Sequence, residues 1–366
     1  MQFIDLKAQQ ALIRDDIDQG ITKILDHGQY ILGPEVQEME ALLAEYAGTS
    51  HCISCASGTD ALQLSMMALG IGPGDEVITT PFSFIATAEV IALLGATPVF
   101  VDIDEKTFNI DAELIESAIS EKTRAIMPVS LFGQCSDMNA INDIAERHGL
   151  PVIEDAAQSF GAEYNGRKSC SLSTIGCTSF FPAKPLGCYG DGGACFTNDD
   201  ELALRMREIR NHGQDRAYHH PRVGVNGRMD SMQAAIILAK MKLFPDEVEA
   251  RSRLGSRYSE LLQNANCTTP FIAEDNRSVY AQYTLLVDDR EGLQQALRDK
   301  NIPSAVYYPI TLDKQPALNG ICRVPAPLAV SEAMAEKVVS IPMHPYLKDE
   351  DMQAICQTIE KHTGSR

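Results

Sequence analysis

Short β-branched runs alternate with longer amphipathic segments from about residue 35 to residue 215, and this alternation restricts the fold more than any other feature. A strand–helix–strand order at this spacing predicts a mostly parallel sheet that is covered by helices on both faces. Sheets of this kind bind ligands beyond the carboxyl ends of their strands. The expected strands are residues 76–79, 97–101, 125–129 and 151–154, and the expected helices are residues 36–46, 61–69, 85–94, 112–119 and 138–148.

The pattern changes after Pro221. Long helices are expected first, and then apolar runs that alternate with helices, which is typical of a smaller α+β unit. We therefore predict a large α/β domain over residues 1–245 and a small C-terminal domain over residues 246–366. The segments behind this division are helices at 229–243, 246–264, 291–300 and 349–361, and apolar runs at 279–287 and 305–308.

Composition excludes several classes of partner. The formal net charge of −19 disfavours nucleic acid and anionic membranes, because the long-range field of the chain repels both. Cys52 and Cys55 form a C-x-x-C without a second pair at zinc-ribbon spacing, so no metal site is expected. The N-terminus lacks a signal-peptide core, and no run reaches the ~18 apolar residues of a membrane span. We expect a cytoplasmic protein.

Two small-residue turns follow expected strands. The first is Ser57-Gly58-Thr59, between a strand at 52–55 and a helix. Free N–H groups at a helix start bind phosphate well, although a Ser cap without any ligand explains the same pattern. The second carries Asp155, which follows a buried strand at the mouth of the sheet. An ordinary capping Asp is the alternative there.

Lys184 stands in an apolar run, Thr178 to Gly187, that is punctuated by Pro and Gly. Apolar surroundings lower the pKa of a lysine and make its amine nucleophilic, whereas the plainer alternative is a lysine that reaches out to solvent. The glycines at 190–194 permit a tight turn and close backbone approach. They do not form G-x-G-x-x-G, which disfavours a nucleotide-binding dehydrogenase.

Taken in order, these motifs resemble the DegT/DnrJ/EryC1/StrS family of sugar aminotransferases. The residues that carry the resemblance are Ser-Gly-Thr at 57–59, Glu-Asp-Ala-Ala-Gln-Ser at 154–159, Ser-Phe-Phe-Pro-x-Lys-x-Leu-Gly at 179–187 and Gly-Asp-Gly-Gly-Ala at 190–194. The resemblance extends from residues 3–6 to residues 342–346. It implies an enzyme of pyridoxal 5′-phosphate (PLP) fold type I, similar to aspartate aminotransferase, with a mostly parallel large-domain sheet and a smaller α+β domain.

The resemblance also implies roles for individual residues. Lys184 is expected to be the catalytic residue, which binds PLP covalently and shuttles the proton, and the cofactor passes through its amine form (PMP) during turnover. Asp155 is expected to pair with the pyridine nitrogen, and Gln158 to lie near the ring hydroxyl. Phe84 is expected to stack on the ring. The remaining cofactor-binding residues are Gly58, Thr59 and Ser179 at the phosphate, and Asn226, which reaches the phosphate of the neighbouring subunit in a homodimer with shared active sites.

One branch of the family looks most similar, and it aminates a UDP-linked 2-acetamido-3-oxo-glucuronate with L-glutamate as donor, for O-antigen sugars. Because this substrate is anionic, Arg228 and Lys314 are candidates for its carboxylate or diphosphate, and a surface role is the alternative for Lys314. Tyr307 stands where the family often has His, which implies a different set of donors around the sugar. The full set of expected substrate-binding residues is Phe3, Tyr30, Phe82, Arg228, Tyr307, Tyr308 and Lys314.

Other functions remain open from the sequence. Dehydratases of the family have His at the position of Lys184, so transamination is favoured. A 4-keto-6-deoxy-sugar aminotransferase is the first alternative, and its substrate has no carboxylate for Arg228 to bind. A non-catalytic regulator with the same fold is the second, but it predicts a degenerate Lys184 and Asp155, and both residues are intact.

Overall fold

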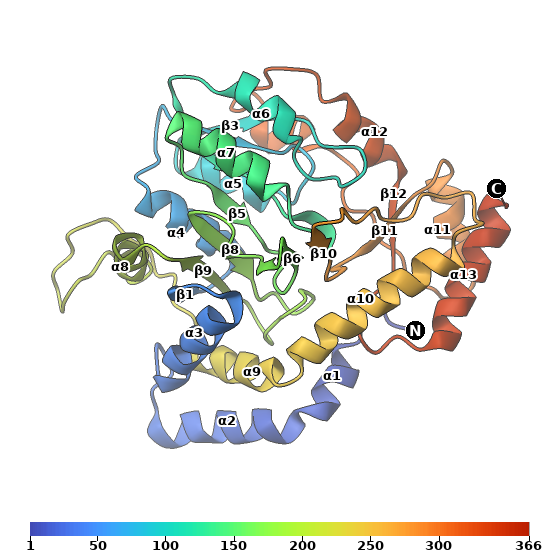
Figure 1. The fold of residues 1–366 in the computed structure, drawn as a ribbon. Coiled ribbons are helices and arrows are strands. Elements are labelled where there is room, and N and C mark those ends of the chain that lie inside the picture. The colour runs from blue at the N-terminus through green and yellow to red at the C-terminus, as the bar shows by residue number, and fades with distance from the viewer. Residues whose placement is uncertain (366) are drawn as a thin grey trace.

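The computed structural model describes residues 1–365, and one large sheet organises them (Figure 1). Its strands follow the order β1-β9-β8-β5-β4-β2-β3, because bridges from Ile126 to Val152 and from Val129 to Asp155 join two separately paired groups of strands. Within this order β9 alone runs antiparallel to its neighbours, so the prediction of a mostly parallel sheet is confirmed. The strands are β1 His51–Cys55, β2 Glu76–Thr79, β3 Thr97–Phe100, β4 Thr123–Met127, β5 Ile153–Asp155, β8 Ile175–Ser179 and β9 Gly193–Thr197.

Helices cover both faces of this sheet, as expected. On one face, side chains of β1, β8 and β9 pack with α4 (Gly58–Ala68), α5 (Ala86–Leu93) and α8 (Asp200–Ile209). On the other face, alternate side chains of the strands pack with α3, α6, α7 and α9. These four helices are α3 Pro34–Ala47, α6 Ala112–Ala118, α7 Met138–His148 and α9 Ser231–Met241.

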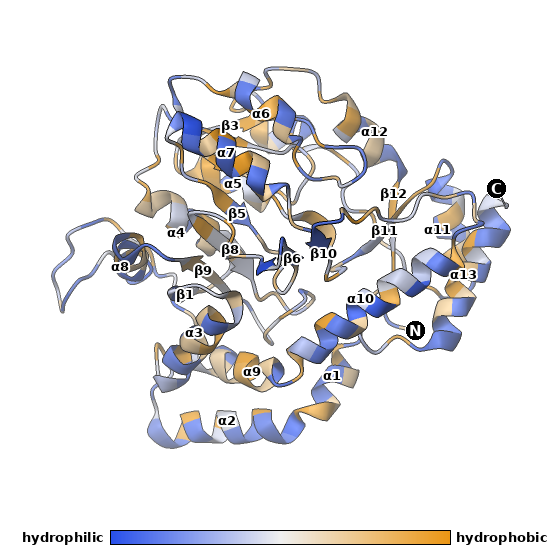
Figure 2. Cartoon of the chain, viewed as in Figure 1, coloured by the Kyte–Doolittle hydropathy of each residue, from blue (hydrophilic) through white to orange (hydrophobic). Residues whose placement is uncertain are grey.

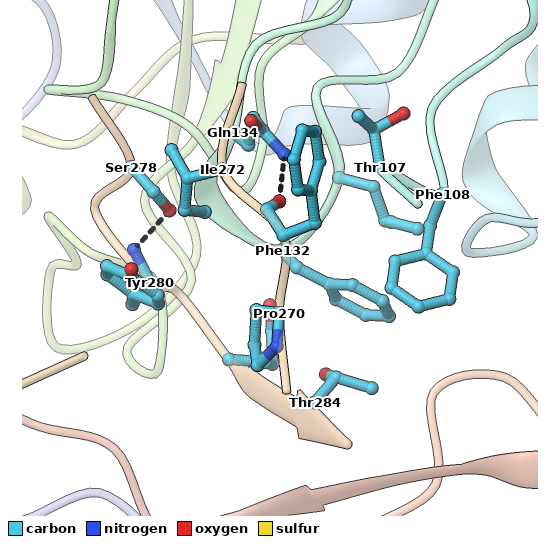
Figure 3. A pocket seen from close by; sticks show the side chains of 12 residues that line it. Thr107, Phe108, Phe132, Gln134, Pro270, Ile272, Ser278, Tyr280 and Thr284 are labelled. Carbon is cyan, nitrogen blue, oxygen red and sulfur yellow. Dashed lines mark hydrogen bonds between the residues drawn. The ribbon is translucent and has the colours of Figure 1, made fainter. Parts of the chain in front are cut away.

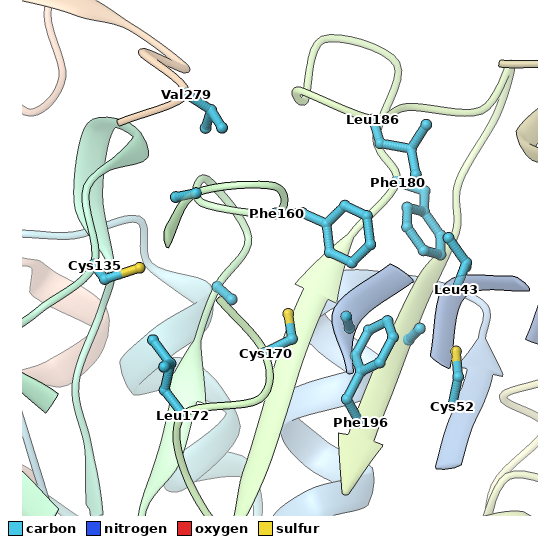
Figure 4. Packing of buried hydrophobic residues seen from close by; sticks show 14 of the residues in the cluster. Leu43, Cys52, Cys135, Phe160, Cys170, Leu172, Phe180, Leu186, Phe196 and Val279 are labelled. Carbon is cyan, nitrogen blue, oxygen red and sulfur yellow. The ribbon is translucent and has the colours of Figure 1, made fainter. Parts of the chain in front are cut away.

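The core on the second face is aromatic and rich in thiols (Figure 4). The ring of Phe160 lies 5.7 Å from that of Phe196 and 6.3 Å from that of Phe180. Figure 2 shows the apolar segments gathered around the sheet, whereas the outer helix α2 (Arg14–His27) is hydrophilic along most of its length. Among residues 1–365, no helix combines the length and the apolar character that crossing a bilayer requires.

The C-terminal part is built on α10 (Phe244–Leu261) and the antiparallel pair β11 (Tyr283–Leu286) and β12 (Val338–Ile341). The strand β11 is shorter than the expected run at 279–287, because Tyr280 takes a left-handed φ of 41° and ends the extended backbone. Residues 305–308 form no strand and make a single bridge, from Ala305 to Ser340. The remaining elements are α1 Leu6–Leu12, β6 Glu163–Tyr164, β7 Arg167–Lys168, β10 Asn276–Arg277, α11 Arg290–Asp299, α12 Ala329–Lys337, α13 Asp349–Thr363, and the short 3-10 helices η1 Leu131–Gly133, η2 Leu312–Lys314 and η3 Pro316–Leu318.

Two segments connect the predicted domains. Arg323 extends the edge of the large sheet through a bridge to Val99, and its guanidinium contacts Glu76 at 2.8 Å. At the other end of the chain, Met343 donates its N–H to the carbonyl of Phe3 at 3.4 Å. The N-terminal residues therefore lie against the C-terminal part, and the division at 245/246 stays a prediction.

Candidate active site

The turn after β1 and the end of β8 meet in a cradle of small residues, Gly58, Thr59 and Ser179. A Cβ atom on Gly58 would lie 2.6 Å from the Cβ of Ser179, so only glycine permits this approach. Ser57 caps α4 by accepting the N–H of Asp60 at 3.0 Å, which is the capping role that the sequence left open. Because the cap uses one amide, the other N–H groups of the first turn remain available to a phosphate. The sequence prediction that these three residues lie together is consistent with this geometry.

The glycines at 190–194 serve the same cradle. A Cβ on Gly193 would lie 2.3 Å from the carbonyl oxygen of Ser57 and 2.8 Å from the nitrogen of Gly58. The residue begins β9, whose antiparallel pairing with β1 brings the two backbones together. The close approach expected from these glycines is therefore present, and it shapes the cradle beside Gly58.

Asp155 ends β5 at the carboxyl edge of the sheet, and it is 5% exposed. Its Oδ2 accepts the hydroxyl of Thr87 at 2.8 Å, and its Oδ1 accepts the N–H of Ala157 at 3.2 Å. Burial raises the pKa of the Asp155 carboxyl, while these two donors and the charge of Lys184 act in the opposite direction. Sequence reasoning missed Thr87, because no local pattern links a residue in α5 to the end of β5.

Lys184 lies in a loop that leaves β8 and returns beside it. The loop is closed by bonds from the Lys184 N–H to the carbonyl of Phe181 at 2.9 Å and from the Cys188 N–H to that of Phe180 at 2.8 Å. Burial lowers the pKa of the Lys184 amine, and the nearby Asp155 raises it. No hydrogen bond or ion pair within the described chain engages the ammonium group. This arrangement is consistent with a reactive amine, and the catalytic role of Lys184 stays a prediction.

Gln158 and Tyr308 form the wall beside Asp155. The Gln158 side chain accepts the N–H of Phe132 at 2.9 Å and donates to the hydroxyl of Tyr308 at 3.1 Å. Burial raises the pKa of Tyr308. Phe84 is 54% exposed, and its ring lies 6.4 Å from that of Tyr308, so it presents an open face at the site.

Phe82 differs from Phe84, because its side chain is fully buried. Its ring lies 6.3 Å from that of Tyr308 and packs edge-on to Phe132, so it supports the wall from behind. Figure 3 shows Phe132 together with Phe108 and Tyr280 around a separate pocket. A substrate contacts Phe82 directly only if the side chains that cover it, Tyr308 and Phe132, move aside.

The remaining predicted residues fall into two groups. The Arg228 loop approaches the cradle, because the Ala56 N–H donates to the carbonyl of Gly227 at 3.0 Å. Arg228 donates from Nη1 to the Oδ1 of Asn211 at 2.8 Å, and its buried Nε has no partner among the described residues. Asn226 in the same loop is exposed. Tyr30 lies beside this loop, because its carbonyl accepts the N–H of Ser231 at 2.8 Å.

Phe3, Tyr307 and Lys314 lie elsewhere on the C-terminal side. The rings of Phe3 and Tyr307 are 6.5 Å apart, which places the N-terminal segment beside the Tyr307–Tyr308 wall. Lys314 forms a half-exposed ion pair with Glu332 at 3.1 Å. This contact favours the surface role that the sequence left open for Lys314. Within residues 1–365, no group of three or more His, Cys, Asp or Glu side chains is arranged to hold a metal ion.

These residues fit PLP at three points. The cradle of Gly58, Thr59 and Ser179 matches a phosphate, the Asp155 carboxylate matches a pyridinium nitrogen, and the free amine of Lys184 matches an aldehyde. When bound, PLP acts as an electron sink that stabilises a carbanion at the carbon bearing the amino nitrogen. Fold and site together define an aminotransferase of PLP fold type I.

Comparison with known proteins narrows this class. Residues 11–360 match the model of the DegT/DnrJ/EryC1/StrS aminotransferase family. The chain belongs to this family, and it is a PLP-dependent sugar aminotransferase. A relative from Pseudomonas aeruginosa, the UDP-2-acetamido-2-deoxy-3-oxo-D-glucuronate aminotransferase, is 58% identical over 98% of this chain and 99% of its own length.

Solved structures agree with this assignment. A family aminotransferase from Brucella abortus has a TM-score of 0.97 and 46% identity, with all of both chains covered. NtdA from Bacillus subtilis, whose structure contains PMP, has a TM-score of 0.89 and 31% identity, and 99% of this chain and 83% of that chain are covered.

Proposed function

We propose that the protein transfers an amino group from L-glutamate to the 3-keto carbon of a UDP-linked 2-acetamido uronic acid, in the synthesis of O-antigen or related polysaccharide sugars. The observation that carries this proposal is the 58% identity to the Pseudomonas aeruginosa enzyme over nearly the full length of both chains. A relative of this similarity that acts on the 3-oxo uronate favours it over the 4-keto-6-deoxy alternative.

The surroundings of the Arg228 guanidinium favour a substrate that has an acidic group. Its Nε is buried without a partner in the described chain, and an unpaired buried donor of this kind costs about 1–3 kcal/mol. A carboxylate of the sugar would accept from this Nε and remove the penalty. Arg228 would thereby recognise the uronate, which has the carboxylate that a 6-deoxy sugar lacks.

Each residue of the site would have its own role in the reaction. Asp155, oriented by Thr87, would hold a proton at the pyridine nitrogen. Lys184 would take the proton from the carbon that loses the amino group and return it to the carbon that gains it. Gln158 and Tyr308, fixed to each other at 3.1 Å, would position the ring hydroxyl and the sugar. Phe84 would cover the face of the ring.

We also propose a homodimer in which each subunit completes the site of the other. The loop that ends in Asn226 supports it, because Tyr218 is 97% exposed and Val223 is 84% exposed there. Exposed apolar side chains on one projecting loop are typical of a contact surface. Asn226 itself is exposed and free to reach a neighbour.

A cytoplasmic location is part of the same proposal. Nine cysteines, Cys267 aside, are free thiols, and eight of these nine are buried. A chain with this many unpaired thiols suits a reducing compartment.

The experiment that tests the function follows the absorbance band of the bound cofactor. The PLP-loaded protein is mixed separately with UDP-2-acetamido-3-amino-glucuronate and with several 4-amino-6-deoxy nucleotide sugars. We expect the band to disappear with the 3-amino uronate alone. Loss of the band only with a 4-amino sugar would replace the proposed substrate, and a protein that shows no band with added PLP would refute the function altogether.

Two variants sharpen this test. Lys184→Ala should abolish the band and turnover, while Lys300→Ala, which changes an exposed lysine, should leave both intact. Arg228→Gln should weaken the response to the 3-amino uronate by at least tenfold. The proposal that Arg228 reads the carboxylate fails if Arg228→Gln responds as the wild-type protein does.

A further inference from the structure

The loop of residues 181–191, called the Lys184 loop below, is closed mainly by bonds within itself and at its base. At the base, Phe180 donates its N–H to the carbonyl of Gly192 at 2.7 Å. Inside the loop, the Cys188 thiol donates to the carbonyl of Gly190 at 3.3 Å. Among residues 1–365, a single hydrogen bond joins this loop to an element other than its flanking strands. In that bond the N–H of Tyr189 donates to Oε1 of Gln233, in the first turn of α9, at 3.0 Å.

The contact between the loop and α9 extends to both sides of this bond. A Cβ on Gly190 would lie 2.9 Å from Nε2 of Gln233, so the loop backbone passes close against the amide group. Lys240 stands about two turns further along α9, and its ammonium lies 4.4 Å from the ring centroid of Tyr189. The helix therefore contacts Tyr189 at its backbone and at its ring.

Gln233 occupies a position where a helix commonly uses such a side chain for its own start. Asp230 is the N-cap of α9 and Gln233 is its third residue, which fits a capping box, where the glutamine reaches back to the N–H of the cap residue. In the structure Asp230 makes no side-chain cap bond, and Gln233 directs its oxygen to Tyr189 instead. The Gln233 side chain thus supports the Lys184 loop rather than its own helix.

The first half of α9 is firmly held, which makes it a suitable support. The hydroxyl of Ser231 accepts the N–H of Gly33 at 3.0 Å. Ala235 packs so closely on α2 that a Cβ on Gly20 would lie 3.1 Å from its own Cβ. Because the helix backbone is fixed by these contacts, the bond from α9 restrains the position of Tyr189.

The same helix start also follows the loop that contains Arg228. Arg228 precedes Asp230 by two residues, and Gln233 follows Asp230 by three. The start of α9 therefore supports both the arginine proposed to bind the uronate and the loop of the lysine proposed to transfer the proton.

We propose that Gln233 is a positioning residue for Lys184, which fixes the Lys184 loop to α9 so that the amine keeps one position relative to Asp155 and the Arg228 loop. The inference rests on the role of Lys184 in the proposed function. Proton transfer requires the two atoms to lie within hydrogen-bond reach, and a misplacement of about 1 Å lowers a rate by on the order of a hundredfold. Gln233 acts on the reaction through Tyr189 and the loop backbone.

Two substitutions of Gln233 test this role in the PLP-loaded enzyme. Gln233→Met removes the acceptor and keeps the length of the side chain, so the Tyr189 N–H loses its partner. We expect the rate constant for loss of the cofactor band to fall about tenfold, both with L-glutamate and with UDP-2-acetamido-3-amino-glucuronate, because Lys184 serves both halves of the reaction. The half-saturating concentration of each compound should stay within about twofold of wild type, since neither compound loses a binding contact.

Gln233→Glu is the conservative variant, because it keeps an oxygen that accepts the Tyr189 N–H. Its rate constants should stay within about threefold of wild type. The matched control is Gln357→Met, which changes an exposed glutamine of α13 and should behave as wild type. A Gln233→Glu variant that loses as much as Gln233→Met would show that the acceptor oxygen is not what matters, and would overturn the proposal.

A second readout does not depend on turnover. Burial lowers the pKa of the Lys184 amine, and Asp155 is the charged group that acts on it in the opposite direction. In the apoenzyme, the rate at which acetic anhydride acetylates Lys184, measured by peptide mass at a series of pH values, reports this pKa. We expect Gln233→Met to raise the pKa toward the ordinary value of a lysine, because a loop released from α9 opens the amine to water. The pKa in Gln233→Glu and Gln357→Met should match that of wild type.

A purely structural role for Gln233 gives a different result. Unchanged rate constants and an unchanged Lys184 pKa in Gln233→Met would overturn the proposal. A variant with a lower free energy of unfolding in urea, but with the rate constants and the Lys184 pKa of wild type, would overturn it too, because Gln233 would then only stabilise α9.

Failure of the proposed function is recognised separately. Borohydride reduction of the PLP-loaded wild-type protein, followed by peptide mapping, should locate the cofactor on Lys184. A wild-type protein that has no cofactor attached at Lys184 would remove the proposed role of this lysine and the inference with it. A wild-type protein labelled at Lys184, with a Gln233→Met variant that matches it in both readouts, would remove the positioning role alone.

Discussion

The hydroxyl of Thr87 lies 2.8 Å from the Oδ2 of Asp155, and this bond ties the first turn of α5 to the end of β5. The hydroxyl of Ser83 is hydrogen-bonded to that of Thr87 at 2.9 Å, so the donor to Asp155 is itself held in place. All three side chains are buried. The carboxylate is therefore oriented before any cofactor arrives, in surroundings that otherwise disfavour its charge.

Removing the Thr87 hydroxyl should weaken the binding of PLP. A hydrogen bond to a charged group contributes about 1.5–3 kcal/mol, so Thr87→Val should lower the affinity for PLP about ten- to a hundredfold. Titration of the apoenzyme with PLP, followed by absorbance, measures this. Thr87→Ser keeps the hydroxyl and should bind nearly as well as wild type. Equal affinities of the Val and Ser variants would show that the bond does not support Asp155.

A methyl group at the cradle should have a comparable effect for a steric reason. Gly58→Ala places a Cβ 2.6 Å from the Cβ of Ser179, so the turn after β1 must move away from β8. We expect PLP binding to weaken at least tenfold in the same titration. Gly72→Ala is the matched control, because its new Cβ meets nothing closer than 4.0 Å. If both variants bind PLP equally, the close approach at Gly58 is not what shapes the phosphate site.

Much of this site follows from the sequence, because its parts are local. Strand ends followed by short turns place Gly58, Asp155 and Lys184 at one edge of a parallel sheet without knowledge of distant contacts. The periodic helices were predicted well for the same reason, as α7 shows with bounds that agree at both ends, at Met138 and His148. The family resemblance then supplied the roles of these residues.

The parts that the sequence did not predict depend on contacts between distant segments. Thr87 and Asp155 are 68 positions apart in the sequence, and no local pattern near either residue predicts their contact. The short β12 has only four residues between the end of α12 and Pro342, and its strand character comes from pairing with β11. The burial of Phe82 depends on Phe108, Phe132 and Tyr308 together, whereas its neighbour Phe84 is exposed.

Glu154 offers a test of stability on the opposite side of the same strand. This fully buried carboxylate accepts the hydroxyls of Ser130 at 2.9 Å and Ser169 at 2.8 Å, and the N–H of Cys170 at 2.8 Å. In Glu154→Gln an amide NH₂ replaces one acceptor and faces donors, which should lower the free energy of unfolding by about 1–3 kcal/mol. Urea denaturation measures this, and Glu113→Gln on the exposed face of α6 should change it little. A fully stable Glu154→Gln would show that these donors find other partners.

Lys240 should destabilise the protein at neutral pH. Its side chain is 1% exposed, and its ammonium lies 4.4 Å from the Tyr189 ring centroid with no hydrogen-bond partner in the described chain. Burial lowers the pKa of Lys240 from 10.5 to about 8. Between these two values the unfolded chain binds more protons than the folded one, so stability should rise with pH over this window. The gain is roughly 3 kcal/mol, at about 1.4 kcal/mol for each pH unit of the shift.

Lys240→Met should remove this dependence, because methionine fills a similar volume without a charge to bury. At pH 7 we expect the variant to be more stable than wild type by up to about 3 kcal/mol, and the difference should shrink as the pH rises from 8 toward 10.5. Urea denaturation at pH 7 and at pH 10 measures both quantities. Lys242→Met, at an exposed lysine paired with Asp16, should follow the wild-type pH dependence. A Lys240→Met variant whose stability ran parallel to wild type across this window would mean that the ammonium is well solvated in the folded protein, and that its burial imposes no penalty.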